Sequence, residues 1–460
     1  MFASVRSEVP GPRSRLLRDA EALHLAPGTQ RISQLAGIAI EGGEGALLRD
    51  VDGNTFIDFV AGIGVASVGH GHPGLAAALA EQAAHCSAGS FATAARSELL
   101  ARIAAVAPAP HLTRTQLYSG GAEAVESAIK LARAHTGKHE VLAFWGGFHG
   151  KSGGVLGLCG SDFKHGLGPL PAGQLLSPFP DTYRCPFGIT RDDPATLSRM
   201  CIDFLRQVIR HQSSGSLAAI LVEPVQGTAG NVVPPPGFLA AVQKVAREHG
   251  ALLILDEMIT GWGRTGRLWG AEHDGVSGDI VIFGKGFGGG FPVSGVLSSG
   301  EIMAAEPWSR PSFSSSSYGG GPLAAAAANA VTRTIVEDKL AENAARVGAT
   351  LLRALQRIGE RHPFVGEVRG RGLLIGMELV QDRRSREPLA KADCEWLFQQ
   401  CLQRGLLTMA YSPRLRINPP LVITEEQALE GAAILDDALT AFAAERRRFT
   451  AAPVEGKRAC

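Results

Sequence analysis

The chain has 460 residues, with 45 Lys and Arg against 44 Asp and Glu and a formal net charge of +1. This balance excludes the excess of basic residues that binding to nucleic acid or to acidic membranes needs, so the expected partners are small molecules. Because 45% of the residues are hydrophobic, the chain can bury a large core, and its length predicts two or three domains.

The cysteines and the N-terminus indicate where the protein works. Seven cysteines without a CxxC pair favour a reducing, cytoplasmic location over a disulfide framework or a zinc site. The first residues contain arginines but no apolar core of a signal peptide, and no apolar run reaches about 18 residues. We therefore expect neither secretion nor a membrane span.

Apolar runs typical of strands alternate with helical patterns through the middle of the chain. Alternation of this kind predicts an α/β domain on a mostly parallel sheet, with ligands at the carboxyl ends of the strands. The predicted strands are 141–145, 217–224, 251–257, 279–283 and 293–298, and the predicted helices are 122–135, 200–212 and 236–250.

The segment SGGAEAVESAIKLAR (119–133) predicts a strand end, two glycines and the start of a helix. Free backbone N–H groups and the helix dipole favour an anion such as phosphate at such a start, with Gly121 and Ala122 as the donors. An ordinary loop before a helix is an equally good interpretation of this motif alone.

The segment WGGFHGK (145–151) follows a predicted strand. Phe148, with His149, can lie flat against a planar ring at this position. Since a lone phenylalanine is more often part of the core, the motif by itself favours the core interpretation.

Two adjacent carboxylates, Asp256 and Glu257, follow an aliphatic run in LLILDEMITGWGRTG (252–266). Carboxylates in apolar surroundings need a cationic partner. A protonated ring nitrogen would serve, and so would a buried salt bridge to Arg264.

Lys285 stands among glycines in IVIFGKGFGGGFP (280–292). The spacing does not match the GxxxxGK[ST] pattern of a phosphate-binding P-loop. A lysine in a partly desolvated site has a lowered pKa and can act as a nucleophile that forms a Schiff base.

The pattern changes from about residue 326. A long helical stretch leads to RGRGLLIGMELV (369–380), a further helix, a short strand at LRI (415–417) and a closing helix from about 425. This order predicts a smaller α+β domain.

Taken together, the four central motifs supply a phosphate cradle, a stacking aromatic ring, a carboxylate for a ring nitrogen and an amine. Pyridoxal 5′-phosphate (PLP) needs this set of groups.

From about residue 30 to 445 the chain resembles the class III, 4-aminobutyrate/ornithine-like PLP-dependent aminotransferases of fold type I. The resemblance rests on these motifs together with FIDFVAGIGVASVGHGHP (56–73), EPVQG (223–227), SYGGGP (317–322) and LRINPPLVIT (415–424). It implies a transferase with a large domain on a mostly parallel sheet and a smaller α+β C-terminal domain.

The implied domain organisation has five parts. We expect a flexible tail over 1–30, an N-terminal segment over 31–75 that joins the small domain and the active site, a large PLP-binding domain over 76–325, a small domain over 326–445, and a flexible tail over 446–460.

The resemblance also implies roles for cofactor-binding residues. Lys285 would form the Schiff base and carry the proton, and Asp256 would hold the ring nitrogen. Other cofactor contacts would be a stacking Phe148 with His149 beside it, Met258 behind the opposite face, Gly121 and Ala122 at the phosphate, and Ser317 from the neighbouring subunit of a homodimer.

For the substrate, the resemblance assigns Arg416 to the α-carboxylate of the amino donor and Glu223 as its resting salt-bridge partner. Ile63 would line the pocket. Lys151 stands where 4-aminobutyrate enzymes carry an arginine, which weakens a 4-aminobutyrate assignment because lysine lacks the guanidinium fork.

Ile259 replaces a family glutamine, and Gln226 is a candidate to take over its contact with the cofactor.

The predicted reaction moves an amino group from a glutamate- or alanine-like donor to an aldehyde or ketone by a ping-pong mechanism. The segment SPFPDTYRCPFG (177–188) is expected to form an extra loop near the entrance. It resembles outlying members of the class, some of which serve aminoglycoside antibiotic biosynthesis, so an amino-sugar precursor stays open as the acceptor class.

The alternatives in a different reaction class are a PLP-dependent racemase, epimerase or decarboxylase on the same fold.

Overall fold

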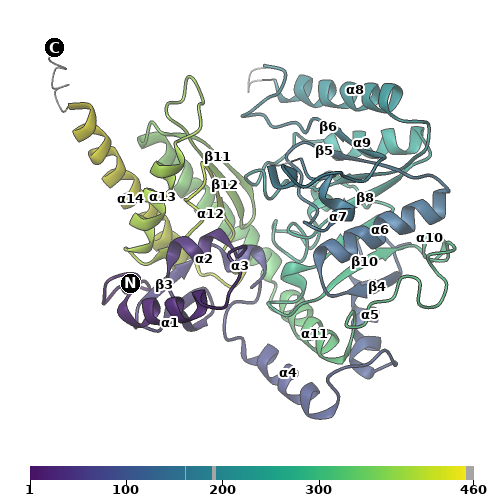
Figure 1. The fold of residues 1–460 in the computed structure, drawn as a ribbon, viewed down its shortest axis with the longest axis horizontal. Coiled ribbons are helices and arrows are strands. Elements are labelled where there is room, and N and C mark those ends of the chain that lie inside the picture. The colour runs from purple at the N-terminus through teal and green to yellow at the C-terminus, as the bar shows by residue number, and fades with distance from the viewer. Residues whose placement is uncertain (161, 189–192, 452–460) are drawn as a thin grey trace.

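A computed structural model describes residues 1–160, 162–188 and 193–451. The chain forms two lobes, a larger one built on a central sheet and a smaller one that contains the C-terminal strands (Figure 1). The N-terminal helices α1 (Pro12–Ala22) and α2 (Arg31–Ala36) lie with the smaller lobe.

The central sheet has seven strands in the order β4-β10-β9-β8-β7-β5-β6. β10 runs antiparallel to both of its neighbours, and the other neighbouring pairs are parallel. The prediction of a mostly parallel sheet is therefore confirmed. The strands are β4 (Arg114–Tyr118), β5 (Glu140–Phe144), β6 (Gln174–Ser177), β7 (Leu217–Val222), β8 (Leu252–Asp256), β9 (Ile280–Phe283) and β10 (Ser294–Ser298).

Helices cover both faces of this sheet, which explains why its inner strands β7, β8 and β9 are almost entirely apolar. In β8, Ile254 packs in the cluster that contains α6, whereas Leu253 and Leu255 belong to the cluster that contains α8 and α9. The predicted helices are present as α6 (Gly121–Thr136), α8 (Pro194–Gln212) and α9 (Phe238–Glu248).

The smaller lobe contains an antiparallel sheet in the order β11-β12-β14, as the α+β pattern predicts. The long helical stretch is divided into two helices, because Lys339 adopts a positive φ of 53° between them. The elements are α11 (Pro322–Glu337), α12 (Leu340–Arg361), β11 (Val365–Arg371), β12 (Leu374–Leu379), α13 (Lys391–Leu402), β14 (Arg414–Ile417) and α14 (Glu425–Ala451).

The expectation that residues 1–30 form a loose tail is wrong. The backbone N–H groups of Phe2 and Ala3 donate to the Glu430 carboxylate, and the Asp52 carboxylate accepts from the first N–H groups of α1. The bonds to Asp52 satisfy helix-start donors that a loose segment would leave to water, and those to Glu430 fix the first residues on α14. At the other end, residues 446–451 continue α14, and 452–460 lie outside the described residues.

The segment 31–75 forms a second sheet in the order β1-β2-β3-β13, with β13 supplied from the smaller lobe. Its strands are β1 (Ile40–Glu44), β2 (Leu47–Asp50), β3 (Thr55–Asp58) and β13 (Leu406–Leu407).

The remaining elements are α3 (Ala61–Gly64), α4 (Pro73–His85), α5 (Ala94–Ala105), α7 (Gly153–Leu156), α10 (Gly300–Met303) and the 3-10 helices η1 (Asp162–Lys164), η2 (Gly270–Asp274) and η3 (Lys285–Phe287).

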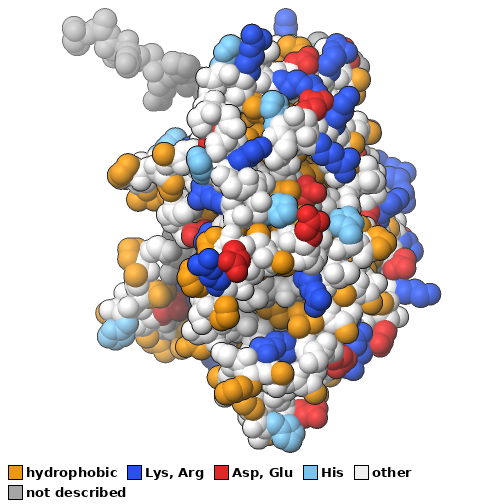
Figure 2. Space-filling view, turned by 90° about the vertical axis from the view of Figure 1, so that its right-hand side faces the viewer, with side chains coloured by type: hydrophobic (Ala, Val, Ile, Leu, Met, Phe, Trp, Pro, Cys, Tyr) orange, Lys and Arg blue, Asp and Glu red, His pale blue; other side chains and the backbone are white. Residues whose placement is uncertain are grey.

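The surface of the larger lobe carries both signs of charge. Figure 2 shows Lys and Arg side chains interspersed with Asp and Glu over the face that it presents. Within the described residues, no helix is both long enough and apolar enough to cross a membrane.

Candidate active site

Three ionisable side chains lie where neighbouring parallel strands end. Glu223 directly follows β7, Asp256 ends β8, and Lys285 follows β9 by two residues. Because the carboxyl ends of parallel strands meet at one edge of the sheet, these three groups converge on the same site.

Two adjoining cavities occupy this edge. The inner cavity measures about 340 Å³ and the outer cavity about 250 Å³. They share part of their walls, so they form one continuous cleft. The shared lining residues are Val65, Phe148, Asp256, Met258 and Lys285.

Lys285 begins the short helix η3 and adopts a positive φ of 44°, which is unusual for a residue with a side chain. Burial lowers the pKa of its ammonium group, although Asp256 and Glu223 act in the opposite direction. The amine is therefore neutral, and able to act as a nucleophile or base, at lower pH than an ordinary lysine. Gly284 beside it packs closely on Met258, since a Cβ there would lie 2.5 Å from the Met258 sulfur and would displace that side chain.

Asp256 is buried and bonded to His149, 107 positions away in the sequence. His149 Nδ1 lies 2.7 Å from Asp256 Oδ2, and the other carboxylate oxygen accepts from the Met258 N–H at 3.1 Å. Burial favours a lower pKa for His149, but the hydrogen bond and negative charge of Asp256 outweigh this effect and raise the pKa. The pair thus places a carboxylate, hydrogen-bonded to a buried imidazole, at the wall of the inner cavity.

Glu257 and Arg264 do not form the salt bridge considered as an alternative for this motif. The Glu257 carboxylate accepts hydrogen bonds from the Thr260 hydroxyl and from the N–H groups of Gly270 and Ala271 at 2.8 Å. Arg264 donates instead to backbone carbonyl groups of the smaller lobe. Asp256 therefore faces the cavity without an arginine partner among the described residues.

The start of α6 forms another part of the inner cavity wall. The Glu123 carboxylate accepts from the N–H groups of Ser119 and Gly120 at 3.0 and 3.3 Å. Gly121 and Ala122 line the cavity, and no hydrogen bond to their N–H groups occurs within the described structure. Two free donors at the positive end of a helix suit a phosphate group.

An aromatic pair stands where the two cavities meet. The Phe148 ring packs edge to face on Phe163, with centroids 5.3 Å apart. The Lys151 ammonium lies 4.7 Å from the centre of the Phe163 ring, a cation–π contact. Phe163 could not be predicted from the sequence, because it lies on the short helix η1 and belongs to no periodic pattern.

Arg416 and Glu223 both line the outer cavity. Glu223 accepts from the N–H groups of Phe148 at 2.9 Å and Gly227 at 3.0 Å, and burial raises the pKa of its carboxyl group. Burial lowers the pKa of Arg416, whereas Tyr411 and Glu223 favour its charged form. In the described part of the chain no ion pair joins Arg416 to Glu223, so the expected resting salt bridge is not formed.

Ile63 enters the outer cavity from a left-handed turn. Ala61, Gly62, Ile63 and Gly64 all have positive φ, with values from 49° to 77°. A β-branched residue is strained in this conformation, and such strain is typical of functional sites. The Asp58 carboxylate supports the turn by accepting from the N–H group of Ala61 at 2.9 Å.

Three expected features lie away from both cavities. Ser317 is exposed and is absent from either lining, and the Gln226 amide donates to the Trp145 carbonyl at 2.9 Å instead of facing the cleft. The described residues 177–188 also line neither cavity. The expectation of an entrance loop is therefore wrong for this segment, which packs on the sheet of the smaller lobe.

The residues around the inner cavity fit PLP in size and in chemistry. Its volume accommodates a small planar cofactor, and its walls provide free N–H donors, an aromatic ring, a buried carboxylate and a desolvated amine. These are the groups that the phosphate, the ring faces, the ring nitrogen and the aldehyde require.

Comparisons with known proteins agree with this chemistry. Residues 29–439 match the family "Aminotransferase class-III". The chain is 33% identical to an alanine/serine racemase of Pyrococcus horikoshii, over 94% of this chain and 91% of the relative. It is 34% identical to a 5-aminovalerate aminotransferase of Pseudomonas aeruginosa, over 88% and 94%.

Among solved structures, the chain is similar to the PLP-bound amine transaminase of an uncultivated Pseudomonas species. The TM-score is 0.84 at 32% identity, and the match covers 92% of this chain and 98% of that one. The chain therefore belongs to the class-III aminotransferase family and is a PLP-dependent enzyme that transfers amino groups.

Proposed function

We propose that the enzyme takes the amino group from an α-amino acid, bound through its carboxylate by Arg416, and passes it to an aldehyde or ketone in a second half-reaction. The observation that carries this proposal is the position of Arg416 and Lys285 on the wall of one cavity. A cation at this site can orient a carboxylated donor toward the amine.

The inner cavity is proposed to hold the cofactor. The N–H groups of Gly121 and Ala122 would bind its phosphate, Phe148 would stack on one ring face, and Met258 would support the other. Asp256 would accept a hydrogen bond from the protonated ring nitrogen. The chemistry supplied by bound PLP is an electron sink and an aldehyde that carries the amino group between half-reactions.

Lys285 has two proposed tasks. Its neutral amine would hold the cofactor aldehyde as a Schiff base, and once displaced by the donor, its Nζ would remove the proton from the donor Cα. His149 would support both by keeping Asp256 oriented, which its 2.7 Å contact with that carboxylate favours.

The outer cavity is proposed to admit both substrates in turn. Arg416 would bind the α-carboxylate of a glutamate- or alanine-like donor, and would turn toward Glu223 when the substrate has none. Their electrostatic interaction without a direct ion pair is consistent with an arginine that can take either arrangement. Ile63 and Lys151 would contact the rest of the substrate.

We further propose a homodimer with shared active sites, in which Ser317 contacts the phosphate bound by the partner subunit. The large side chain of Tyr318, next to Ser317 in the chain, is 74% exposed, which supports a covering partner at this position. The cytoplasmic location expected from the cysteine pattern stays a prediction.

We expect Arg416→Ala to raise the KM for L-glutamate and L-alanine by about 10- to 100-fold, because hydrogen bonds to a charged group are lost. The KM for 1-phenylethylamine, which has no carboxylate, should stay within about twofold. Steady-state kinetics with each donor measures both values.

Arg353→Ala is the matched control for this experiment, since Arg353 is an exposed arginine of α12 that donates to Thr350. It should change neither KM. Equal losses for carboxylated and uncarboxylated donors in Arg416→Ala would contradict the assignment of Arg416 to the carboxylate.

A further inference from the structure

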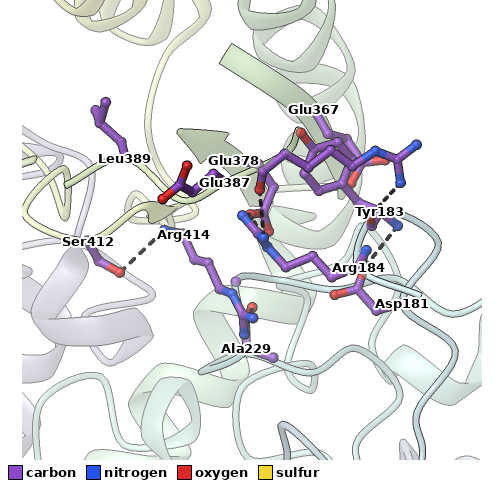
Figure 3. A network of polar contacts seen from close by, with 12 residues as sticks. Asp181, Tyr183, Arg184, Ala229, Glu367, Glu378, Glu387, Leu389, Ser412 and Arg414 are labelled. Atoms are coloured by element: carbon purple, nitrogen blue, oxygen red, sulfur yellow. Dashed lines mark hydrogen bonds and ion pairs between the residues drawn. The ribbon is translucent and has the colours of Figure 1, made fainter. Parts of the chain in front are cut away.

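The connection between β6 and α8 links the two lobes through Arg184. Its Nε donates to Glu378 Oε2 at 2.8 Å, and its Nη2 lies 2.8 Å from the same oxygen. Arg184 belongs to the larger lobe and Glu378 to β12 of the smaller lobe. Figure 3 shows the arginine extended across the boundary to this carboxylate.

Glu378 is fully buried and has a second arginine partner. Its Oε1 accepts from Arg369 Nη2 at 2.8 Å, and the Arg369 side chain is also largely buried. A desolvated carboxylate between two arginines is held firmly, and the loss of either partner leaves the buried charge incompletely compensated.

The orientation of Arg184 is fixed by its surroundings. Its Nη1 donates to the Arg386 carbonyl at 3.0 Å, and Arg386 Nη1 in turn donates to the Tyr183 carbonyl at 2.7 Å. The two guanidinium groups lie 5.5 and 5.1 Å from the centre of the Tyr183 ring. The reciprocal bonds therefore attach residues 183–184 to the smaller lobe at several points.

The inner end of this network contacts the loop whose preceding residues, Gly227 and Thr228, line the outer cavity. Arg369 donates to the carbonyl groups of Gly230 at 2.8 Å and Asn231 at 3.3 Å. The backbone of Gly230 lies so close to Gly376 of β12 that a Cβ on Gly376 would clash with its carbonyl oxygen. Since Gly227 and Thr228 line the outer cavity, this contact places the loop that carries them against β12.

β12 also fixes the strand that carries Arg416. In the register of β12 and β14, Gly376 pairs with Arg416 and Glu378 pairs with Arg414. The Arg414 side chain reaches back to the Ala229 carbonyl at 3.4 Å (Figure 3). The distance between Arg416 and the large-lobe wall of the cavity thus depends on how the two lobes pack at Glu378.

We propose that Arg184 is a positioning residue for the amino donor: by tying Glu378 to the larger lobe, it holds Arg416 at the distance from Lys285 that a carboxylated donor requires. This inference rests on the proposed role of Arg416. Arg184 itself touches neither cavity, so its effect passes through the sheet of the smaller lobe.

The test compares the wild-type holoenzyme with Arg184→Ala and Arg184→Lys. For Arg184→Ala we expect the KM for L-glutamate and L-alanine to rise about 2- to 30-fold. The KM for 1-phenylethylamine and the absorbance of the bound cofactor should stay unchanged. Hydrogen exchange at the backbone N–H groups of 414–417 should become faster. Arg184→Lys should lie between Arg184→Ala and the wild type in its KM for carboxylated donors and in this exchange rate.

Arg206→Ala is the matched control, because Arg206 pairs with Glu248 entirely within the larger lobe. It should leave the KM values and the exchange at 414–417 unchanged. Equal KM changes for both kinds of donor, or wild-type KM and exchange in Arg184→Ala, would overturn the proposal. If Arg416→Ala leaves the donor KM unchanged while exchange is faster in Arg184→Ala, Arg416 does not bind the donor carboxylate. The contact between Arg184 and Glu378 would then still stabilise the packing of the two lobes.

Discussion

Lys285→Ala is expected to lower the rate of amino transfer by at least about 10⁴-fold, because it removes the amine proposed to bind the cofactor and to act as the base at the donor Cα. Burial in the cleft lowers the pKa of the Lys285 amine, and alanine supplies no amine at this position. The purified variant should also lose the visible absorbance that borohydride bleaches. Absorbance spectra before and after reduction, together with initial rates, measure both effects.

Lys244→Ala provides the control for this variant, since Lys244 is an exposed residue of α9 far from both linings. It should keep the absorbance and the rate of the wild type. Full activity in Lys285→Ala, or bleachable absorbance that survives the substitution, would show that a different amine holds the cofactor.

Asp256→Asn is expected to reduce kcat/KM by about 10²- to 10³-fold, a loss typical of removing one preorganised electrostatic contact. The amide is isosteric but neutral, so it no longer favours a protonated ring nitrogen and no longer raises the pKa of His149. Lys285 is intact in this variant, so borohydride should still bleach the cofactor. Slow turnover with retained covalent attachment of the cofactor would separate the electrostatic role of Asp256 from the covalent role of Lys285.

The matched control is Asp203→Asn, because Asp203 is an exposed aspartate of α8. It should behave as the wild type in rate and absorbance. If Asp256→Asn keeps wild-type turnover, then the carboxylate has a structural task at the end of β8 and does not assist the reaction.

The inner strands of the central sheet could be predicted from the sequence because they are buried on both faces. β7, β8 and β9 form nearly continuous aliphatic runs, and each is followed within two residues by a polar group of the site. The same local signal is missing from β1, whose residues Ile40–Glu44 include two glycines and are not buried. Its sheet is completed by β13, more than 300 residues later, a pairing that no local pattern indicates.

The candidate site could be predicted in its components but not in its pairings. Lys285 and Asp256 were identified by the cost of burying a charge, which is a local property of the sequence. The choice of His149 as the partner of Asp256, and the failure of Glu257 to pair with Arg264, depend on contacts between distant segments. Arg184 was missed for the same reason, since its partner Glu378 lies 194 positions away.

The central claim is net transfer of an amino group, and isotope labelling tests it most directly. The holoenzyme would be incubated with ¹⁵N-labelled L-alanine or L-glutamate and with an aldehyde or ketone acceptor, and the products would be analysed by mass spectrometry. The account predicts one equivalent of keto acid for each equivalent of ¹⁵N-labelled amine formed from the acceptor. Racemisation of the donor with the label retained and no keto acid formed would contradict it.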